Sequence, residues 1–181
     1  MKGIPTSVEG AILLEPQVFG DDRGYFYESF NSKVFSALLG EEISFVQDNH
    51  SKSSCGVLRG LHYQVINPQG KLVRVAEGEV FDVIVDLRKS SPSFGKWFGV
   101  YLSAQNRRQL WVPPGFAHGF YVTSDAAQFL YKTTDYYDPI HERTIAWDDK
   151  TLNIQWPLQS PPTLSAKDRS GSSFMSAELF E

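Results

Sequence analysis

Residues 56–64 read Gly56-Val57-Leu58-Arg59-Gly60-Leu61-His62-Tyr63-Gln64, a strand-like segment that sets one arginine and one histidine among apolar residues. A single histidine in such a pattern is more often a hydrogen-bonded structural residue than a catalytic group, so its role depends on the rest of the chain. Strict alternation along a strand would place Arg59 and His62 on opposite faces. A bulge at Gly60 would bring both side chains to one face.

The composition is that of a β-rich globular protein. Of the 181 residues 41% are hydrophobic and 14% aromatic, and this chain length can bury a core without disulfides or a structural metal. No repeat, low-complexity tract or linker divides the sequence. We therefore expect a single domain over residues 1–181, with a proline-rich C-terminal tail from about residue 148 packed on it. Within this tail, Ser165 could cap a short helical turn that reaches Asp168.

Charge and cysteine content argue against several classes of partner. The net charge is −4 and no run of five basic residues occurs, so nucleic acid is not an expected ligand. Cys55 is the only cysteine, which excludes an intrachain disulfide and fits a reducing cytosol. The N-terminus lacks a signal-peptide pattern, and no stretch of about 18 apolar residues follows. We expect a soluble, cytoplasmic protein with no membrane partner.

Short β-prone segments separated by turn residues dominate the chain after residue 56. They are Val57 to Gln64, Leu72 to Ala76, Val80 to Leu87, Trp97 to Leu102, Arg108 to Val112, His118 to Val122 and Gln128 to Thr133. The one convincing early helix begins after Asn31 and ends at Gly40. This pattern predicts an all-β fold, a jelly-roll β-sandwich or barrel with a few short helices.

The N-terminal part contributes several polar residues at turns and strand ends. Gly20 to Gly24 is a turn cluster between two strands and contains Arg23. Alternation then places Glu28 among aromatic residues on one strand face, where a carboxylate needs a partner. The polar residues Gln47 to His50 are interpreted as the solvated end of a strand that leads into a turn, with ligand binding left open.

Motifs for phosphate binding or covalent catalysis are missing, because neither GxGxxG, GxxxxGK[ST] nor GxSxG occurs. The segment Val112 to Phe120 contains PxGxxH, which resembles the second motif of cupin jelly-roll proteins and ends at His118. The first cupin motif would supply HxH and a glutamate, but Tyr63 and Gln64 follow His62, and residues 65 to 70 contain no acid. One or two imidazoles alone bind a metal weakly, so we predict a cupin-type barrel without a metal.

Several motifs together resemble the dTDP-4-dehydrorhamnose 3,5-epimerase family. They are Arg59-Gly60-Leu61-His62-Tyr63-Gln64, Gln69-Gly70-Lys71-Leu72-Val73, Pro114 to Phe120, Tyr131-Lys132 and Leu164 to Asp168. The likeness extends from Gly3 to about Asp168. It implies epimerisation of a dTDP-4-keto-6-deoxyhexose without a cofactor. It also implies a homodimer that exchanges strands, so that residues near Arg23 reach the neighbouring site.

The same resemblance implies a role for each site residue. His62 would be the general base, Asp168 its partner and Tyr131 the proton donor on the opposite face. Substrate contacts are implied for Arg23, Glu28, Gln47, Asn49, Arg59, Lys71, His118, Glu142 and Lys167. Tyr137 could stack on the thymine ring, although packing explains a Tyr-Tyr-Asp-Pro turn equally well.

Elementary chemistry agrees with these roles. A 4-keto group acidifies the hydrogens at C3 and C5, so epimerisation needs a base, an enolate stabiliser and an acid rather than a redox cofactor. An imidazole with a pKa near ~6.5 suits a base at neutral pH. Lys71 is the candidate for stabilising the negative charge on O4. Arg59 and Arg23 suit the diphosphate, because guanidinium groups bind it with paired donors.

Three alternatives remain open from the sequence. The chain could invert one carbon only, since relatives that do so share much of the pattern. It could be a metal-dependent cupin enzyme with His62 and His118 as ligands, or a module that binds sugar nucleotides without turnover. Solvent-deuterium exchange, chelation and calorimetry would distinguish these possibilities.

Overall fold

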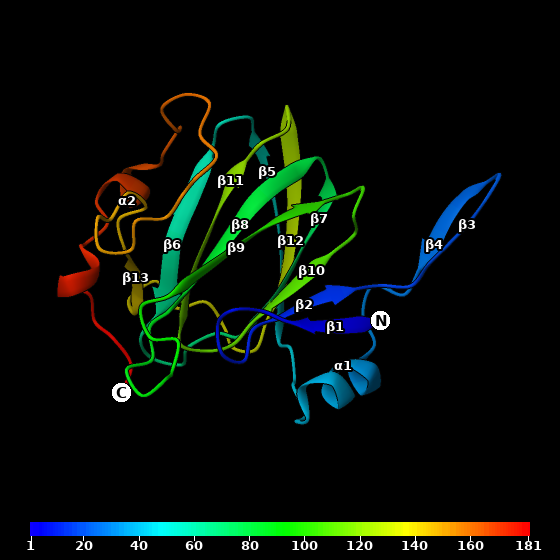
Figure 1. Ribbon diagram of the computed structural model, residues 1–181, viewed down its shortest axis with the longest axis horizontal. Coiled ribbons are helices and arrows are strands. Elements are labelled where there is room, and N and C mark those ends of the chain that lie inside the picture. Colours follow the sequence, from blue (N-terminus) through cyan, green and yellow to red (C-terminus); the bar gives the residue numbers. More distant parts are fainter.

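Two antiparallel sheets face each other in the computed structural model, which describes residues 1–181 (Figure 1). One sheet has six strands in the order β1-β2-β10-β7-β12-β5, and the other has five in the order β13-β6-β11-β8-β9. A separate hairpin and short helices complete the fold. The predicted all-β sandwich with few helices is confirmed.

The six-stranded sheet consists of β1 (Lys2–Pro5), β2 (Ile12–Glu15), β10 (Gln109–Val112), β7 (Lys71–Glu77), β12 (Ala126–Thr133) and β5 (Gln47–Ser54). The five-stranded sheet consists of β13 (Glu142–Thr144), β6 (Leu58–Gln64), β11 (Phe116–Val122), β8 (Glu79–Asp86) and β9 (Trp97–Ser103). The hairpin is β3 (Val18–Asp21) and β4 (Gly24–Tyr27), and the helices are α1 (Ser32–Leu39), α2 (Ala166–Arg169) and the 3-10 helix η1 (Phe174–Ser176). None of the helices has the length and apolar character that a bilayer crossing requires.

Apolar side chains fill part of the space between the sheets. Val73 and Phe129 of the six-stranded sheet belong to one buried cluster with Ile84 of the five-stranded sheet. The outer face of the five-stranded sheet is buried as well, where Val83 and Val85 belong to a second cluster. Because β8 is covered on both faces, apolar residues occupy both faces of this strand.

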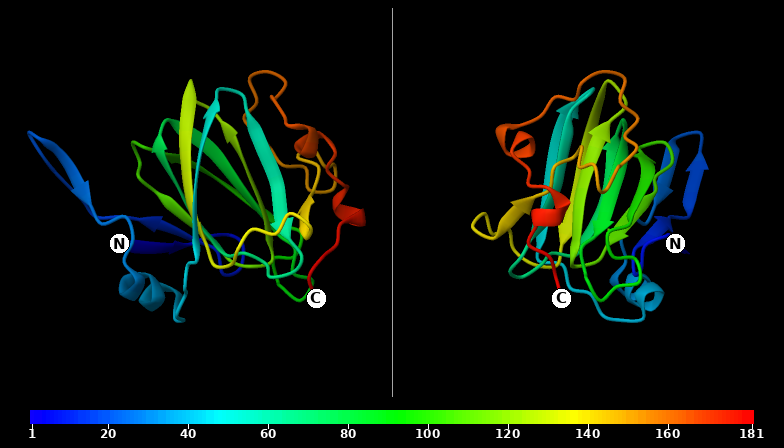
Figure 2. Two further views of the ribbon diagram at one scale, coloured as in Figure 1. Left: turned by 180° about the vertical axis from the view of Figure 1, so that it is seen from behind. Right: turned by 60° about the vertical axis from the view of Figure 1, so that its left-hand side comes forward.

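The tail from about residue 148 covers that outer face (Figure 2). It contains only short helical turns and isolated bridges, which join Thr163 to Val57, Ser172 to Ile145 and Phe180 to Arg88. The side chains of Leu152 and Phe174 are buried against the sheet. This packing places α2 beside β6, so a residue late in the chain can approach His62.

Helix α1 packs on the other sheet. The side chain of Asn31 accepts hydrogen bonds from the amides of Lys33 and Val34, and Gly40 ends the helix with a φ of 77°. Phe35 is fully buried in a cluster with Trp111. The predicted helix and both of its ends are therefore confirmed.

Two expectations about polar segments were wrong. Gln47–Ser54 is not a strand end and turn but a complete edge strand, β5, which pairs with β12 along its length. Its inward positions are polar, so the sequence lacks the apolar alternation typical of a strand. Glu28 lies outside β4 and is exposed to solvent instead of lying among aromatic residues, and it accepts a hydrogen bond from Asn31.

The β3–β4 hairpin extends away from both sheets (Figures 1 and 2). Its turn contains Arg23, which is exposed and bonded to the adjacent Asp21. The paired residues Phe19 and Phe26 are 56% and 71% exposed. Aromatic side chains so exposed on an extended arm are typical of a surface that another protein covers.

Candidate active site

A cavity of about 390 Å³ opens between the two sheets. Its size is within the range of small-molecule sites. The site residues expected from the sequence that line it are Gln47, Asn49, Arg59, His62, Lys71, His118, Tyr131, Glu142 and Lys167. Asp168 lies behind His62 and contacts it. Arg23 and Glu28 do not line the cavity, because the hairpin and the segment after it lie apart from it.

The histidine and its carboxylate come from β6 and α2. Nε2 of His62 lies 2.7 Å from Oδ1 of Asp168, whose side chain is only 4% exposed. Burial alone would raise the pKa of Asp168, but hydrogen bonds from His62, Ser165 and the Gly60 amide outweigh it and lower this pKa. Burial lowers the pKa of His62. The hydrogen bond to Asp168 opposes this change, and the positive charge of Lys167 adds to it. The pair is a neutral imidazole beside an ionised carboxylate at pH 7.

A bulge in β6 allows Arg59 and His62 to reach the same cavity. His62 is opposite His118 and Arg59 is opposite Phe120, so two residues of β6 face the single residue between them on β11. Gly60 has a φ of 118°, and a Cβ there would lie 2.5 Å from the Cα of Gly119. Only glycine fits this conformation and approach. The bulge considered from the sequence is confirmed.

Lys71 and Tyr131 stand on the opposite sheet from His62, on β7 and β12. Burial lowers the pKa of Lys71 to about 8, against the attraction of Glu142 and Asp82. Lys71 therefore still carries its charge at neutral pH. Burial and the charge of Glu142 raise the pKa of Tyr131, which keeps the phenol protonated.

Asp82 is a residue that the sequence did not indicate. It is fully buried on β8, and both of its carboxylate oxygens lie near Nε2 of His118, at 3.1 and 2.9 Å. The His118 ring stacks on Phe129 with centroids 5.9 Å apart. The sequence feature that could have indicated Asp82 is its position, an inward-facing acid between Val80 and Ile84, because a buried carboxylate requires a partner.

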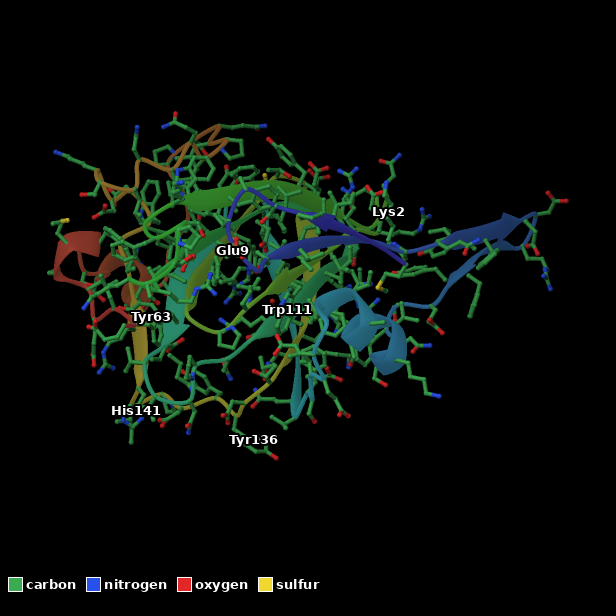
Figure 3. All side chains as sticks on the ribbon, turned by 60° about the horizontal axis from the view of Figure 1, so that its bottom comes forward. Lys2, Glu9, Tyr63, Trp111, Tyr136 and His141 are labelled. Atoms are coloured by element: carbon green, nitrogen blue, oxygen red, sulfur yellow. The ribbon has the colours of Figure 1, made fainter.

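The rim of the cavity is held by a polar network. Glu142 accepts two 2.8 Å hydrogen bonds from Nζ of Lys167 and one from the hydroxyl of Tyr137. The amide of Tyr137 also donates to Gln47. Tyr137 belongs to the loop between β12 and β13, which lies at one end of the sandwich and includes the labelled Tyr136 and His141 of Figure 3. Tyr137, left undecided from the sequence, is therefore at the cavity.

Three histidines line the cavity, His50, His62 and His118, and they do not form a metal-binding cluster. No group of three or more His, Cys, Asp or Glu side chains has an arrangement suited to a metal ion. The donor set does not fit the three protein ligands of a catalytic metal site.

Comparison with known proteins identifies the family. The family model described as dTDP-4-dehydrorhamnose 3,5-epimerase matches residues 5–176. The chain is 59% identical over 180 residues to the dTDP-4-dehydrorhamnose 3,5-epimerase of Pseudomonas aeruginosa, an alignment that covers 99% of each chain. The chain belongs to the dTDP-4-dehydrorhamnose 3,5-epimerase family.

Solved structures of this epimerase family share the fold closely. The protein is similar, with a TM-score of 0.95 and 52% identity, to the Legionella pneumophila epimerase in complex with dTDP-4-keto-L-rhamnose, over 98% of this chain and 94% of that one. It is also similar to a 3'-monoepimerase of Streptomyces bikiniensis solved with dTDP-quinovose, with a TM-score of 0.90 and 33% identity over 95% and 87% of the chains. The resemblance seen in the sequence motifs is thereby confirmed.

Proposed function

We propose that the chain epimerises dTDP-4-dehydro-6-deoxy-D-glucose at C3 and C5, giving dTDP-4-dehydro-L-rhamnose in dTDP-rhamnose biosynthesis. The observation that carries the proposal is the cavity of a 3,5-epimerase family member with the His62–Asp168 pair on one wall and Tyr131 on the other. Base and acid on opposite walls suit the inversion of a carbon, because the returning proton must arrive from the face opposite the base.

His62 acts as the general base in this proposal. Its Nε2–H is donated to Asp168, which leaves Nδ1 free to accept a proton from C3 or C5. The 4-keto group of the substrate makes this proton acidic, and the electron pair moves into an enolate. The ionised Asp168 then stabilises the imidazolium that forms, as the carboxylate does in other His–Asp pairs.

The opposite wall completes the reaction. Lys71, charged at neutral pH, stabilises the enolate oxygen from a partly buried position in the cavity. Tyr131 donates a proton to the carbon from the face opposite His62 and is restored by solvent. Each inverted carbon gains one proton and loses one, so no redox cofactor takes part.

Arg59 binds the diphosphate of the nucleotide, together with Arg23 from a second copy of the chain. The Nε of Arg59 donates to Ser53 at 3.0 Å, which orients the guanidinium at the cavity. Arg23 cannot serve its own cavity from the extended hairpin. A homodimer in which each hairpin crosses to the neighbouring site would supply Arg23 and Glu28 and cover the exposed Phe19 and Phe26.

The proposal includes a single functional domain in the cytoplasm. The tail belongs to the same unit as the sandwich, because its Asp168 completes the pair with His62. Cys55 is a free, exposed thiol, which fits a reducing compartment.

Reaction in D2O tests the function directly. Purified protein and dTDP-4-dehydro-6-deoxy-D-glucose should incorporate deuterium at both C3 and C5, detected by proton NMR together with the inverted product. Deuterium at one carbon only would indicate a mono-epimerase, and binding without exchange would indicate a non-catalytic module. Loss of activity with EDTA and recovery with a divalent metal would favour the metal-dependent alternative, whereas full activity with EDTA supports the proposed one.

A further inference from the structure

Helix α2 has only four residues, and its cap is built from the dyad carboxylate. The hydroxyl of Ser165 donates to Oδ2 of Asp168 at 2.6 Å, and the amide of Asp168 donates back to the Ser165 oxygen at 3.2 Å. The Ser165 amide also lies 3.3 Å from Oδ2. These contacts form a reciprocal capping box in which Asp168 is the third residue of the helix.

The two oxygens of Asp168 have separate partners. Oδ2 accepts only from Ser165, through its hydroxyl and its amide. Oδ1 accepts from Nε2 of His62 at 2.7 Å and from the amide of Gly60 at 3.1 Å. Rotation of the carboxylate about its own axis would break bonds on both sides at once. The cap therefore fixes the plane of the carboxylate and keeps one of its oxygens directed at the imidazole.

We propose that Ser165 is a positioning residue for the reaction, because its hydroxyl binds Oδ2 and thereby directs Oδ1 to His62. The inference rests on the proposed function, in which Asp168 orients and stabilises the imidazole. A helix of four residues has little stability of its own. Stabilising this helix therefore does not by itself account for the complete capping box. The cap has a precise geometric consequence instead, since alignment errors of about 1 Å at a catalytic pair can cost roughly 10²-fold in rate.

Three substitutions separate positioning from simple helix capping. Gly is nearly as good a cap residue as Ser but has no hydroxyl, Ala is a poor cap without a hydroxyl, and Thr keeps the hydroxyl. Ser165 is exposed, so the extra methyl of Thr has room. If Ser165 positions the carboxylate, Ser165→Gly and Ser165→Ala should both lower kcat by roughly 10-fold or more, comparable to the loss on removing a group that orients a metal-bound histidine. KM should change little, and Ser165→Thr should retain kcat.

Ser93→Ala is the matched control. The hydroxyl of Ser93 donates to the buried Asp86 at 2.6 Å, the same distance as in the Ser165–Asp168 bond, but this pair lies outside the cavity. Its removal should lower the melting temperature and leave kcat unchanged.

The measurements are kcat and KM for dTDP-4-dehydro-6-deoxy-D-glucose, the rate of deuterium uptake from D2O, and the melting temperature of each variant. Wild-type kcat in Ser165→Gly would overturn the inference, and so would an equal kcat loss in Ser93→Ala. A His62→Ala variant run in parallel tests the proposed function separately. If His62→Ala is inactive while Ser165→Gly is fully active, only the role of Ser165 fails. If His62→Ala turns over normally, the assignment of the base fails.

Discussion

His62 and His118 lie directly opposite each other on the paired strands β6 and β11, and each is bonded through Nε2 to a buried carboxylate. The carboxylates come from different parts of the chain, because Asp168 belongs to the tail and Asp82 to β8. One wall of the cavity therefore presents two carboxylate-bonded imidazoles, while Lys71 belongs to the opposite sheet. In the proposed mechanism, proton abstraction takes place at the first wall and stabilisation of the enolate at the second.

Loss of the base and loss of the acid should have different signatures. His62→Ala should abolish deuterium uptake at both C3 and C5, because abstraction itself requires the imidazole. Tyr131→Phe should keep some uptake at one carbon while yielding little inverted product, because only the return of the proton from the other face is lost. NMR of the products in D2O measures both quantities. Near-normal turnover of correctly folded His62→Ala would show that His62 is not the base and has a structural role only.

Asp82→Asn should damage both stability and turnover. The substitution preserves volume but replaces the carboxylate that accepts from His118, in a site that water does not reach. We expect a loss of about 1–3 kcal/mol in the free energy of unfolding, measured in urea. We also expect kcat to fall. In a double-mutant cycle with His118→Gln the two losses in kcat should be less than additive, since the residues act as a unit. Additive losses would mean that Asp82 and His118 act independently.

The pH dependence of kcat/KM should be bell-shaped. The pKa of His62 is lowered from its ordinary value of 6.5, so the imidazole is mainly unprotonated at pH 6.5 and the acid limb should lie below that value. The pKa of Lys71 is about 8, so its charge is lost above that pH and an alkaline limb should lie there. Lys71→Arg should move the alkaline limb upward, because a guanidinium stays charged. An unchanged alkaline limb in this variant would exclude Lys71 as its origin.

Gly60→Ala should destabilise the fold severely. The new Cβ would lie 2.5 Å from Gly119 Cα and 2.8 Å from the His118 carbonyl oxygen, on a residue with a φ of 118°. Backbone strain and overpacking together should cost about 2–5 kcal/mol in the free energy of unfolding. Gly40→Ala is the control, because Gly40 also has a positive φ, of 77°, but open space around it. Equal losses in the two variants would show that the close approach to β11 contributes nothing.

Subunit mixing should reveal whether Arg23 serves a neighbouring site. Arg23→Ala should raise KM by roughly 10- to 100-fold, from the loss of a charged hydrogen bond worth about 1.5–3 kcal/mol. Co-expressed Arg23→Ala and His62→Ala chains would form mixed dimers in which one site carries both defects and the other carries none. Such dimers should regain activity that neither variant shows alone under limiting substrate. Absence of recovery, in mixed dimers verified by mass spectrometry, would contradict the shared site.

Local sequence patterns predicted those parts of the molecule where apolar residues and turn signals determine the structure. The strand containing His62 was located by its apolar neighbours, and α1 by its cap at Asn31 and its end at Gly40. The edge strand β5 could not be found this way, because its inward side chains line a polar cavity rather than a core. Asp82 was missed because its partner, His118, becomes a neighbour only through sheet pairing. Glu28 was misplaced because β4 ends at Tyr27, whereas the alternation indicated a strand that continues past Glu28.

His62 and Asp168 are separated by 106 residues, and this separation has a consequence for biosynthesis. On the ribosome the strands of the sandwich emerge first, and the tail follows. A ribosome stalled before residue 168 would hold a nascent chain whose imidazole has no carboxylate beside it. The carboxylate that completes the pair is therefore among the last residues of the chain to be made, and the imidazole has its partner only once the tail has been translated and has packed on the sandwich.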